Sequence, residues 1–224
     1  MAKKILMKFT SRDRFPTLVK CIIEYHRLAN NPKDMLWLFT FDEDDNTINL
    51  NEFQQLMKYL EVDYHAFFGV SHSKIHAINR DVEKVMSKEW DILLNISDDQ
   101  LPITHGYDDF IREYMPDTLD YSLWFNDGHQ NEIITQEILG RKYYENQGYI
   151  YYPEYKSFFC DNESTQVAEK HGKLVKSPLC IVKHFHPVWG ANEHIQDDEL
   201  YRKNNSHWEH DKELHFKRKA DGIF

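Results

Sequence analysis

Apolar runs of strand length alternate with helix-like segments four times in the first hundred residues. Between the runs, apolar residues recur at three- and four-residue spacing, as Phe15, Leu18 and Ile22 do, which is typical of helices with one buried face. Such alternation predicts a mostly parallel sheet with right-handed crossovers and helices on its faces. We therefore expect an α/β fold, with strands near residues 5–9, 35–41, 64–70 and 92–96.

The length and composition indicate one folded domain. The 224 residues contain no repeat or convincing linker, and 41% hydrophobic residues can supply a packed core. A formal net charge of -10 argues against a generally basic nucleic-acid surface. Lys and Arg residues gather between positions 202 and 219, but Glu209, Asp211 and Glu213 lie among them. We expect that segment to be a mixed-charge helix face.

The cysteines and the N-terminal sequence favour a cytoplasmic protein. Cys21, Cys160 and Cys180 are odd in number and lack metal-type spacing, so reduced thiols are expected. The first residues contain no apolar run long enough for a signal peptide. No segment reaches the length of a membrane span.

The pattern is looser beyond Pro102. We expect strands over 121–125, 149–152 and 179–185, and helices over 133–147 and 164–171. The turn at residues 126–128 would close the first of these strands.

Two adjacent carboxylates, Asp98 and Asp99, follow the apolar run that ends at Ile96. Burial of that run would fix both at the carboxyl edge of the sheet, where open α/β folds hold ligands. Paired carboxylates there can bind a hard divalent cation and, through it, a phosphate. The same residues equally fit a solvated turn after an ordinary strand.

Charged residues follow the other expected strands too. Arg12 and Arg14 follow the first strand, Asp42 begins an acidic cluster after the second, and Lys74 comes shortly after the third. Parallel strands end at one edge, so these groups would suit a ligand that carries a diphosphate, although solvated loops would produce part of the pattern. The Gly-rich signatures of dinucleotide sites and P-loops are absent.

The order of these segments resembles the GT-A nucleotide-sugar glycosyltransferases, especially family 2. The resemblance is carried by Thr10–Arg14, the Asp42 cluster, Lys74–Arg80 and the run Trp90–Asp99, and it is strongest over about residues 4–102. It implies a GT-A (Rossmann-like), mostly parallel sheet flanked by helices, with a smaller mixed sheet in the acceptor half. About residues 1–102 would bind the donor, and about 103–224 would supply the acceptor site and a C-terminal lid or helix, all within one domain.

The resemblance implies an activity and a base-binding end of the site. The activity is metal-dependent transfer of one sugar from a nucleotide diphosphate sugar, UDP-sugar favoured, to an acceptor hydroxyl. Thr10, Arg12 and Arg14 would lie near the base or ribose, and Asp42 would accept from a nucleobase N–H. The second strand ends Asp-Glu-Asp-Asp rather than the common Asp-Asp-Gly-Ser, a departure that affects Asp42. From the residues alone, the two arginines equally fit surface charges.

The resemblance places the phosphates and the metal at the other end. Lys74 would approach the diphosphate, and Asn79 and Ser97 would complete the donor site. Asp98 would contact the ribose or the metal, and Asp99 would ligate Mn²⁺ or Mg²⁺, which prefer oxygen ligands. Lys74 equally fits a solvated lysine, and Asn79 equally fits a residue that caps or positions a loop.

The general base is expected before the helix that starts near Ser164. Asp161 and Glu163 follow an aromatic run there, in a position similar to the acidic element that carries the base in inverting members. Partial burial near aromatics would raise the pKa of a carboxyl base. Asp161 is our first candidate and Glu163 the second. The alternative is that Asp161 merely caps the helix.

The remaining candidates concern the acceptor and a third metal ligand. Trp124, Asp127 and Gly128 lie where the family's acceptor loop would fall, although a tryptophan in a strand equally fits the core. His186 is the preferred late histidine for the metal, over His184, although single histidines are more often structural.

The sequence also fits other functions. The same carboxylates fit a nucleotidyltransferase or metal-dependent phosphohydrolase, and a non-catalytic nucleotide-sugar binding module would keep them too. No Gln-x-x-Arg-Trp motif occurs, which argues against a processive synthase. The acceptor is open between a saccharide and a hydroxymethylated phage-type DNA base, and the oligomeric state is undetermined.

Overall fold

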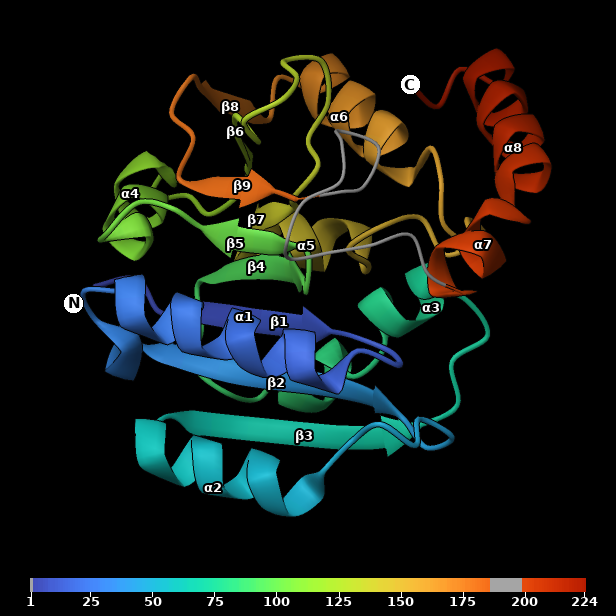
Figure 1. Cartoon of the computed structure of the whole chain (residues 1–224). Helices are drawn as coiled ribbons and strands as arrows, with labels where there is room; N and C mark the ends of the chain where they lie inside the picture. Colours follow the sequence, from blue (N-terminus) through green and yellow to red (C-terminus); the bar gives the residue numbers. More distant parts are fainter. Residues whose placement is uncertain (1, 186–198) are drawn as a thin grey trace.

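The computed structural model describes residues 2–185 and 199–224. Its first half alternates strand and helix in the expected order (Figure 1). The strands are β1 (Ile5–Thr10), β2 (Met35–Asp42), β3 (Asp63–Gly69) and β4 (Ile92–Ser97). The helices are α1 (Phe15–Leu28), α2 (Leu50–Leu60) and α3 (Lys74–Asn79), with 3-10 turns at Pro32–Asp34 and Val82–Val85. Helix α3 ends at Asn79, and Asp81 follows with a φ of 76°, which lies outside the right-handed helical region.

The second half consists of shorter elements. Its strands are β5 (Gln100–Pro102), β6 (Ser122–Phe125), β7 (Ile138–Gly140), β8 (Leu174–Ser177) and β9 (Val182–His184). Its helices are α4 (Tyr107–Tyr114), α5 (Arg141–Gln147), α6 (Cys160–Lys170), α7 (Glu199–Asn205) and α8 (Trp208–Ala220). Within the described ranges, no helix has the length and apolar character needed to cross a bilayer.

Several expectations for the second half are wrong. The segment 133–147 is helical only from Arg141, because Ile138–Gly140 forms strand β7 against β4. Residues 149–152 form no strand, and α6 begins at Cys160, four residues before the expected start. The strand expected over 179–185 comprises only Val182–His184. Elements of three or four residues are too short to show a periodic pattern, so tertiary burial selects them.

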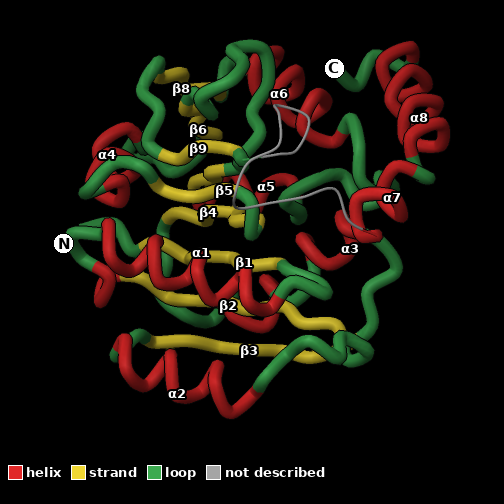
Figure 2. Tube along the Cα trace, in the orientation of Figure 1, coloured by secondary structure: helices red, strands yellow, loops and turns green. Residues whose placement is uncertain are grey.

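One sheet runs through both halves of the chain. Its strand order is β3-β2-β1-β4-β7-β6-β8, and β5 pairs with β9 in a separate antiparallel sheet. Strands β3, β2, β1 and β4 are parallel, whereas β7 is antiparallel to both of its neighbours. Side chains alternate between the two faces, so Met7 and Phe9 pack with α1 and α2 while Leu6 packs with Ile75 of α3. Figure 2 shows the strands as a layer with helices on either side. The predicted α/β class and mostly parallel sheet are confirmed.

The register of the parallel strands brings their carboxyl ends level. Thr10 of β1 lies opposite Thr40 of β2 on one side and Ser97 of β4 on the other. The arrowheads of β1, β2 and β3 point to the side of the molecule that carries α3 and α7 (Figure 1). Residues that follow these strands therefore meet at one edge.

We predict that Gly140→Ala destabilises the protein through a backbone clash. A Cβ atom at Gly140 would lie 2.2 Å from the carbonyl oxygen of Leu119, and backbone cannot move aside as a flexible side chain would. We expect a loss of about 1–3 kcal/mol or more in the free energy of unfolding, measured with urea. Gly172→Ala is the control, since a Cβ there meets nothing within 4 Å and only its φ of 64° is unfavourable. Equal losses in the two variants would contradict the clash.

Candidate active site

A cleft of about 930 Å³, including its open mouth, lies at the carboxyl ends of β1, β2 and β4. The start of α3 forms one wall, and Leu200, Lys203 and Asn204 of α7 face it together with His207. Part of the C-terminal region, where the resemblance implies a lid or helix, therefore contacts the cleft. Most of the predicted donor-binding residues line it: Thr10, Arg12, Arg14, Asp42, Lys74, Ser97, Asp98 and Asp99.

Asn79 is placed elsewhere. Its side chain accepts the backbone N–H groups of Ile150 and Tyr151 and donates to the Tyr151 carbonyl. It holds the loop after α5 against α3, which corresponds to the loop-positioning alternative. Any contact between Asn79 and a donor stays a prediction.

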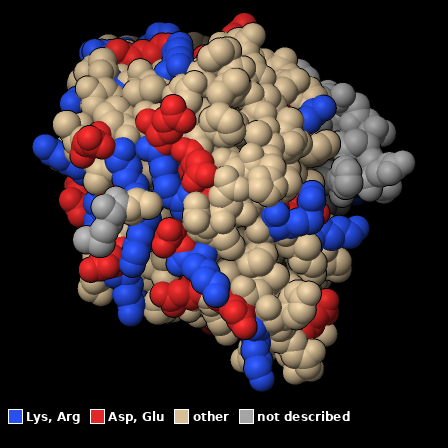
Figure 3. Space-filling view, turned by 90° about the vertical axis from the view of Figure 1, so that its left-hand side faces the viewer, with Lys and Arg blue, Asp and Glu red and all other residues tan. Residues whose placement is uncertain are grey.

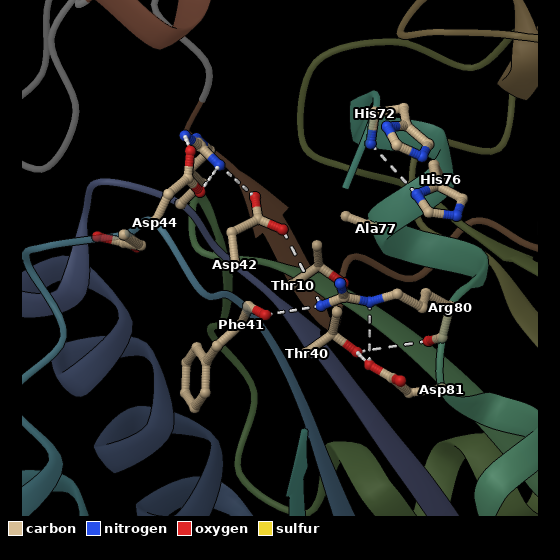
Figure 4. Close-up of polar contacts among 12 residues, drawn as sticks. Thr10, Thr40, Phe41, Asp42, Asp44, His72, His76, Ala77, Arg80 and Asp81 are labelled. Carbon is tan, nitrogen blue, oxygen red and sulfur yellow. Dashed lines mark hydrogen bonds and ion pairs between the residues drawn. The ribbon is translucent and has the colours of Figure 1, made fainter. Parts of the chain in front are cut away.

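The carboxylate of Asp42 is held between two guanidinium groups. Arg12 Nη1 donates to Asp42 Oδ2 at 2.6 Å, and the same guanidinium pairs with both oxygens of Asp44. From the other side, Arg80 Nη2 donates to the Phe41 carbonyl at 2.6 Å and lies 4.0 Å from Asp42 Oδ1 (Figure 4). Asp42 Oδ1 is buried and accepts no hydrogen bond from the part of the chain that the structure describes. Because Asp42 lines the cleft, this oxygen is the candidate acceptor for an N–H group of a bound ligand.

A fully buried lysine lies beneath the cleft. Lys8 Nζ donates to Thr40 Oγ1 at 2.6 Å, to Thr10 Oγ1 at 3.1 Å and to the Ala77 carbonyl at 3.2 Å, and all three acceptor residues line the cleft. Thr40 Oγ1 in turn donates to the buried Asp81 at 2.8 Å. Burial lowers the pKa of Lys8 to about 7, although the charge of Asp81 opposes the shift.

Sequence reasoning assigned no role to Lys8, Arg80 or Asp81. A lysine inside the apolar strand Ile5–Thr10 was a usable signal, because buried lysines are rare unless they have partners. Arg80 and Asp81 gave no comparable signal, since their partners on β2 lie about forty residues away in sequence.

The lowered pKa predicts how Lys8→Met changes the pH dependence of stability. Between pH 7 and 10 the unfolded chain binds a proton at Lys8 that the folded chain does not, so unfolding becomes harder as the pH rises. The free energy of unfolding of the wild type, relative to Lys8→Met, should rise by about 1.4 kcal/mol per pH unit in this range. Urea unfolding at several pH values measures the difference, and a constant difference would contradict the assignment.

Asp98 and Asp99 are both buried in the cleft wall. Asp98 accepts hydrogen bonds from Ser11 Oγ at 2.5 Å and Arg14 Nη1 at 3.4 Å. Burial, and next the charge of Asp99, raise the pKa of Asp98 to about 6. Asp99 Oδ2 lies 3.4 Å from His184 Nε2. Burial raises the pKa of Asp99, but the hydrogen bond and charge of His184 outweigh it and hold that pKa below its usual range.

The groups around Asp99 fit a hard divalent cation. An ionised carboxylate suits Mg²⁺ and Mn²⁺, and the imidazole of His184 beside it offers a nitrogen ligand when neutral. Within residues 2–185 and 199–224, no group of three or more His, Cys, Asp and Glu side chains could hold an ion alone. Such ions are commonly bound by one or two carboxylates together with substrate phosphates, so a protein cage is not required. His186, the predicted ligand, lies outside the described residues.

Asp161 and Glu163 differ in their surroundings. Asp161 is half-buried in the first turn of α6, where burial raises its pKa and the charges of Lys74 and His184 lower it. Asp161 is not among the residues that line the cleft, although the charges of Lys74, which does line it, and of His184 act on Asp161. Glu163 is buried, forms a two-point ion pair with Arg218 and accepts a hydrogen bond from the Tyr155 hydroxyl at 2.8 Å. Of the two carboxylates, Asp161 is the better placed to accept a proton.

Asp161 does not cap helix α6, so the alternative role considered for it is wrong. The N-cap of α6 is Phe159, and no side chain makes a capping hydrogen bond there. Asp161 Oδ1 accepts only the neighbouring Asn162 N–H among the hydrogen bonds identified in the described residues.

The predicted acceptor residues lie around β6 and its turn. Trp124 is 8% exposed and its Nε1 donates to the Ile133 carbonyl, as a core tryptophan would. Asp127 accepts the backbone N–H groups of His129 and Gln130, and it lines a small cavity shared with His184. Gly128 has a φ of 88°, which favours glycine at this turn. Their acceptor role stays a prediction.

Solved structures share this architecture at low sequence identity. The mannosyltransferase PcManGT from Pyrobaculum calidifontis, in complex with GDP-Man and Mn²⁺, matches 85% of this chain with a TM-score of 0.66 and 9% identity. The Streptococcus pneumoniae glycosyltransferase GlyE matches 100% of it with a TM-score of 0.58 and 10% identity. A Drosophila β-1,4-galactosyltransferase 7 variant with manganese, UDP-Gal and xylobiose matches 90% with a TM-score of 0.52 and 12% identity.

This chain has the GT-A fold. At these identities the likeness establishes the fold alone, and the chain spans 59% of PcManGT, 64% of GlyE and 79% of the galactosyltransferase. No protein-family model and no curated protein sequence matches the chain. Within the GT-A fold, the cleft at the ends of β1, β2 and β4 is where an activity has to be sought.

Proposed function

We propose that this protein is a metal-dependent glycosyltransferase that uses a nucleotide diphosphate sugar. One observation carries the proposal: Asp42, which can accept an N–H, and Asp99, whose surroundings fit a cation, line the same cleft. Asp42 is the last residue of β2 and Asp99 follows β4, and β1 lies between these strands. Two strand spacings amount to about 10 Å. A nucleobase at Asp42 and a diphosphate at Asp99 can therefore belong to one bound molecule.

The end of the cleft that contains Asp42 favours a nucleobase with a ring N–H. Asp42 Oδ1 accepts such a group, and uracil and guanine each carry one next to a carbonyl, whereas adenine and cytosine do not. Arg80 and Arg12 hold the carboxylate in place. We expect a UDP-sugar first, and we note that GDP-Man and UDP-Gal occupy the similar structures.

The phosphate end supplies charge stabilisation. A bound Mn²⁺ or Mg²⁺ would neutralise the negative charge that develops on the departing diphosphate. Asp99 would hold the cation, with His184 within reach as a further ligand. Asp98 would orient the site through Ser11 and Arg14, and Lys74 would stabilise the diphosphate as it leaves.

Asp161 would act as the general base. It would take the proton of the acceptor hydroxyl while that oxygen bonds to the anomeric carbon of the sugar. The bond from this carbon to the diphosphate breaks in the same displacement, and the diphosphate leaves with the electron pair. Direct displacement of this kind inverts the anomeric centre.

A saccharide hydroxyl is the proposed acceptor. Xylobiose is present in the similar galactosyltransferase structure, and the cavity that contains Asp127 opens beside His184. A hydroxymethylated DNA base has no support in the structure. The net charge is -10, and on the face drawn in Figure 3 Lys and Arg side chains are interspersed with Asp and Glu.

We also propose one domain and a cytoplasmic location. The seven-stranded sheet continues from the donor half into the acceptor half, which favours folding as one unit. Cys21, Cys160 and Cys180 are free thiols, which fits a reducing compartment.

A donor panel with and without Mn²⁺ tests the metal assignment. We expect sugar release or transfer from UDP- or GDP-sugars to require the cation, and Asp99→Asn to lower turnover about a hundredfold or more. Asp117→Asn is the matched control, because its side chain is 99% exposed. Turnover without metal would contradict the proposal, and release of inorganic phosphate or of a nucleoside monophosphate would favour a phosphohydrolase or nucleotidyltransferase.

The base assignment predicts a separation of binding from turnover. Asp161→Asn should lower kcat by about 10²–10⁴-fold and leave the affinity for the nucleotide diphosphate unchanged. Because the pKa of Asp161 is raised by burial, the wild-type kcat should fall with decreasing pH at a higher pH than an ordinary carboxyl would give. Full activity of Asp161→Asn would overturn this role, and binding without turnover of any donor in the wild type would indicate a binding module.

A further inference from the structure

A buried aspartate on the C-terminal helix holds the segment that leads into α6. Asp211 lies in the first turn of α8 and is completely buried. Its carboxylate accepts the backbone N–H groups of Lys156, Ser157 and Phe158 at 2.9, 2.7 and 2.8 Å. The expected mixed-charge helix is present as α8, but Asp211 is buried against the rest of the protein. An ionised carboxylate with three such bonds fixes three consecutive peptide groups.

The held segment connects two parts of the proposed active site. Phe159, the next residue, has a φ of 60°, a conformation that residues with a side chain rarely adopt, and Cys160 and Asp161 follow it directly. On the other side, the Lys156 carbonyl accepts the backbone N–H of Ile75 at 3.3 Å, beside Lys74. One short loop thus lies between the proposed base and the lysine proposed for the diphosphate.

The same helix is anchored to α6 a second time. Arg218, near the end of α8, makes the two-point ion pair with Glu163 on α6, and its guanidinium lies 3.3 Å from the ring centre of Tyr152. This gives Glu163 a structural partner on α8. Helix α8 is therefore bonded to residues 156–158 through its first turn and to α6 through its last turn.

The first turn of α8 also reaches the donor cleft. Lys203 and Asn204 of α7 line the cleft together with His207, the residue just before α8. The backbone N–H of Asp211 donates to the His207 carbonyl at 3.0 Å, so the two residues are one helical turn apart. Figure 1 shows α7 next to α3, with α8 rising from α7 toward the level of α6. A ligand that contacts His207 thus acts on the turn that contains Asp211.

We propose that Asp211 is a positioning residue that couples occupancy of the donor cleft to the placement of Asp161. It rests on the function proposed above. Asp211 keeps residues 156–158 in place, and these residues hold Phe159 in its unfavourable conformation and thereby set the position of the first turn of α6, which contains Asp161. Donor binding against His207 tightens the same contacts, so the base is held most firmly when a donor is present.

Asp211→Asn tests the positioning role. The amide has the same shape but only one acceptor oxygen, so at least one of the three N–H groups loses its partner. We expect kcat for transfer to fall about tenfold to a hundredfold, and the Kd for UDP and Mn²⁺ to rise by a smaller factor, because coupling between the two is reciprocal. Glu209→Gln is the control, since it neutralises an exposed carboxylate in the same helical turn and should behave as wild type. A folded Asp211→Asn protein with unchanged kcat would overturn the proposal.

Hydrogen exchange in the wild type tests the coupling without any variant. The amides of residues 156–158 should exchange slowly, and more slowly still when UDP and Mn²⁺ are bound. Exchange that does not respond to the bound nucleotide would overturn the coupling even if Asp211→Asn fails to fold. Absence of transfer from every donor would instead refute the proposed function, and the protection of these amides would still report on the contacts of Asp211.

Discussion

The parallel pairing of β1 with both β2 and β4 is the constraint on which the site depends. Because Thr10 lies opposite Thr40 and Ser97, the residues that follow these strands are brought to one level. A shift of one residue would turn the apolar side chains of β1 to the wrong faces, so burial holds the register. The cleft is thus a consequence of how the core packs.

The charges gathered at this edge are costly unless a ligand or a partner compensates them. Lys8, Asp42, Asp81, Asp98 and Asp99 are all buried, and each is surrounded by hydroxyls, guanidinium groups or an imidazole. Charged groups of this kind seldom stabilise a fold by themselves. The proposed ligand would compensate part of this cost, through its N–H group at Asp42 and through the cation proposed at Asp99.

The first half of the fold could be predicted from the sequence because its strands and helices are long enough to show a periodic pattern of apolar residues. The sequence also predicted that Asp42, Asp98, Asp99 and Lys74 lie close together, because the carboxyl ends of parallel strands meet at one edge of the sheet. Sequence reasoning failed for β7 and β8, whose few residues are strands only because β4 and β6 offer partners. It missed Arg80 and Asp211 for a similar reason, because each acts on backbone groups about forty to fifty-five residues away in sequence.

The central claim is that the cleft binds a nucleoside diphosphate through a cation at Asp99. A crystal structure of the protein grown with UDP and Mn²⁺, with anomalous scattering recorded for manganese, tests it most directly. The account predicts a manganese peak bonded to the Asp99 carboxylate and to diphosphate oxygens, with the uracil N–H on Asp42. Manganese bound away from Asp99, or a nucleotide outside the cleft, would contradict it.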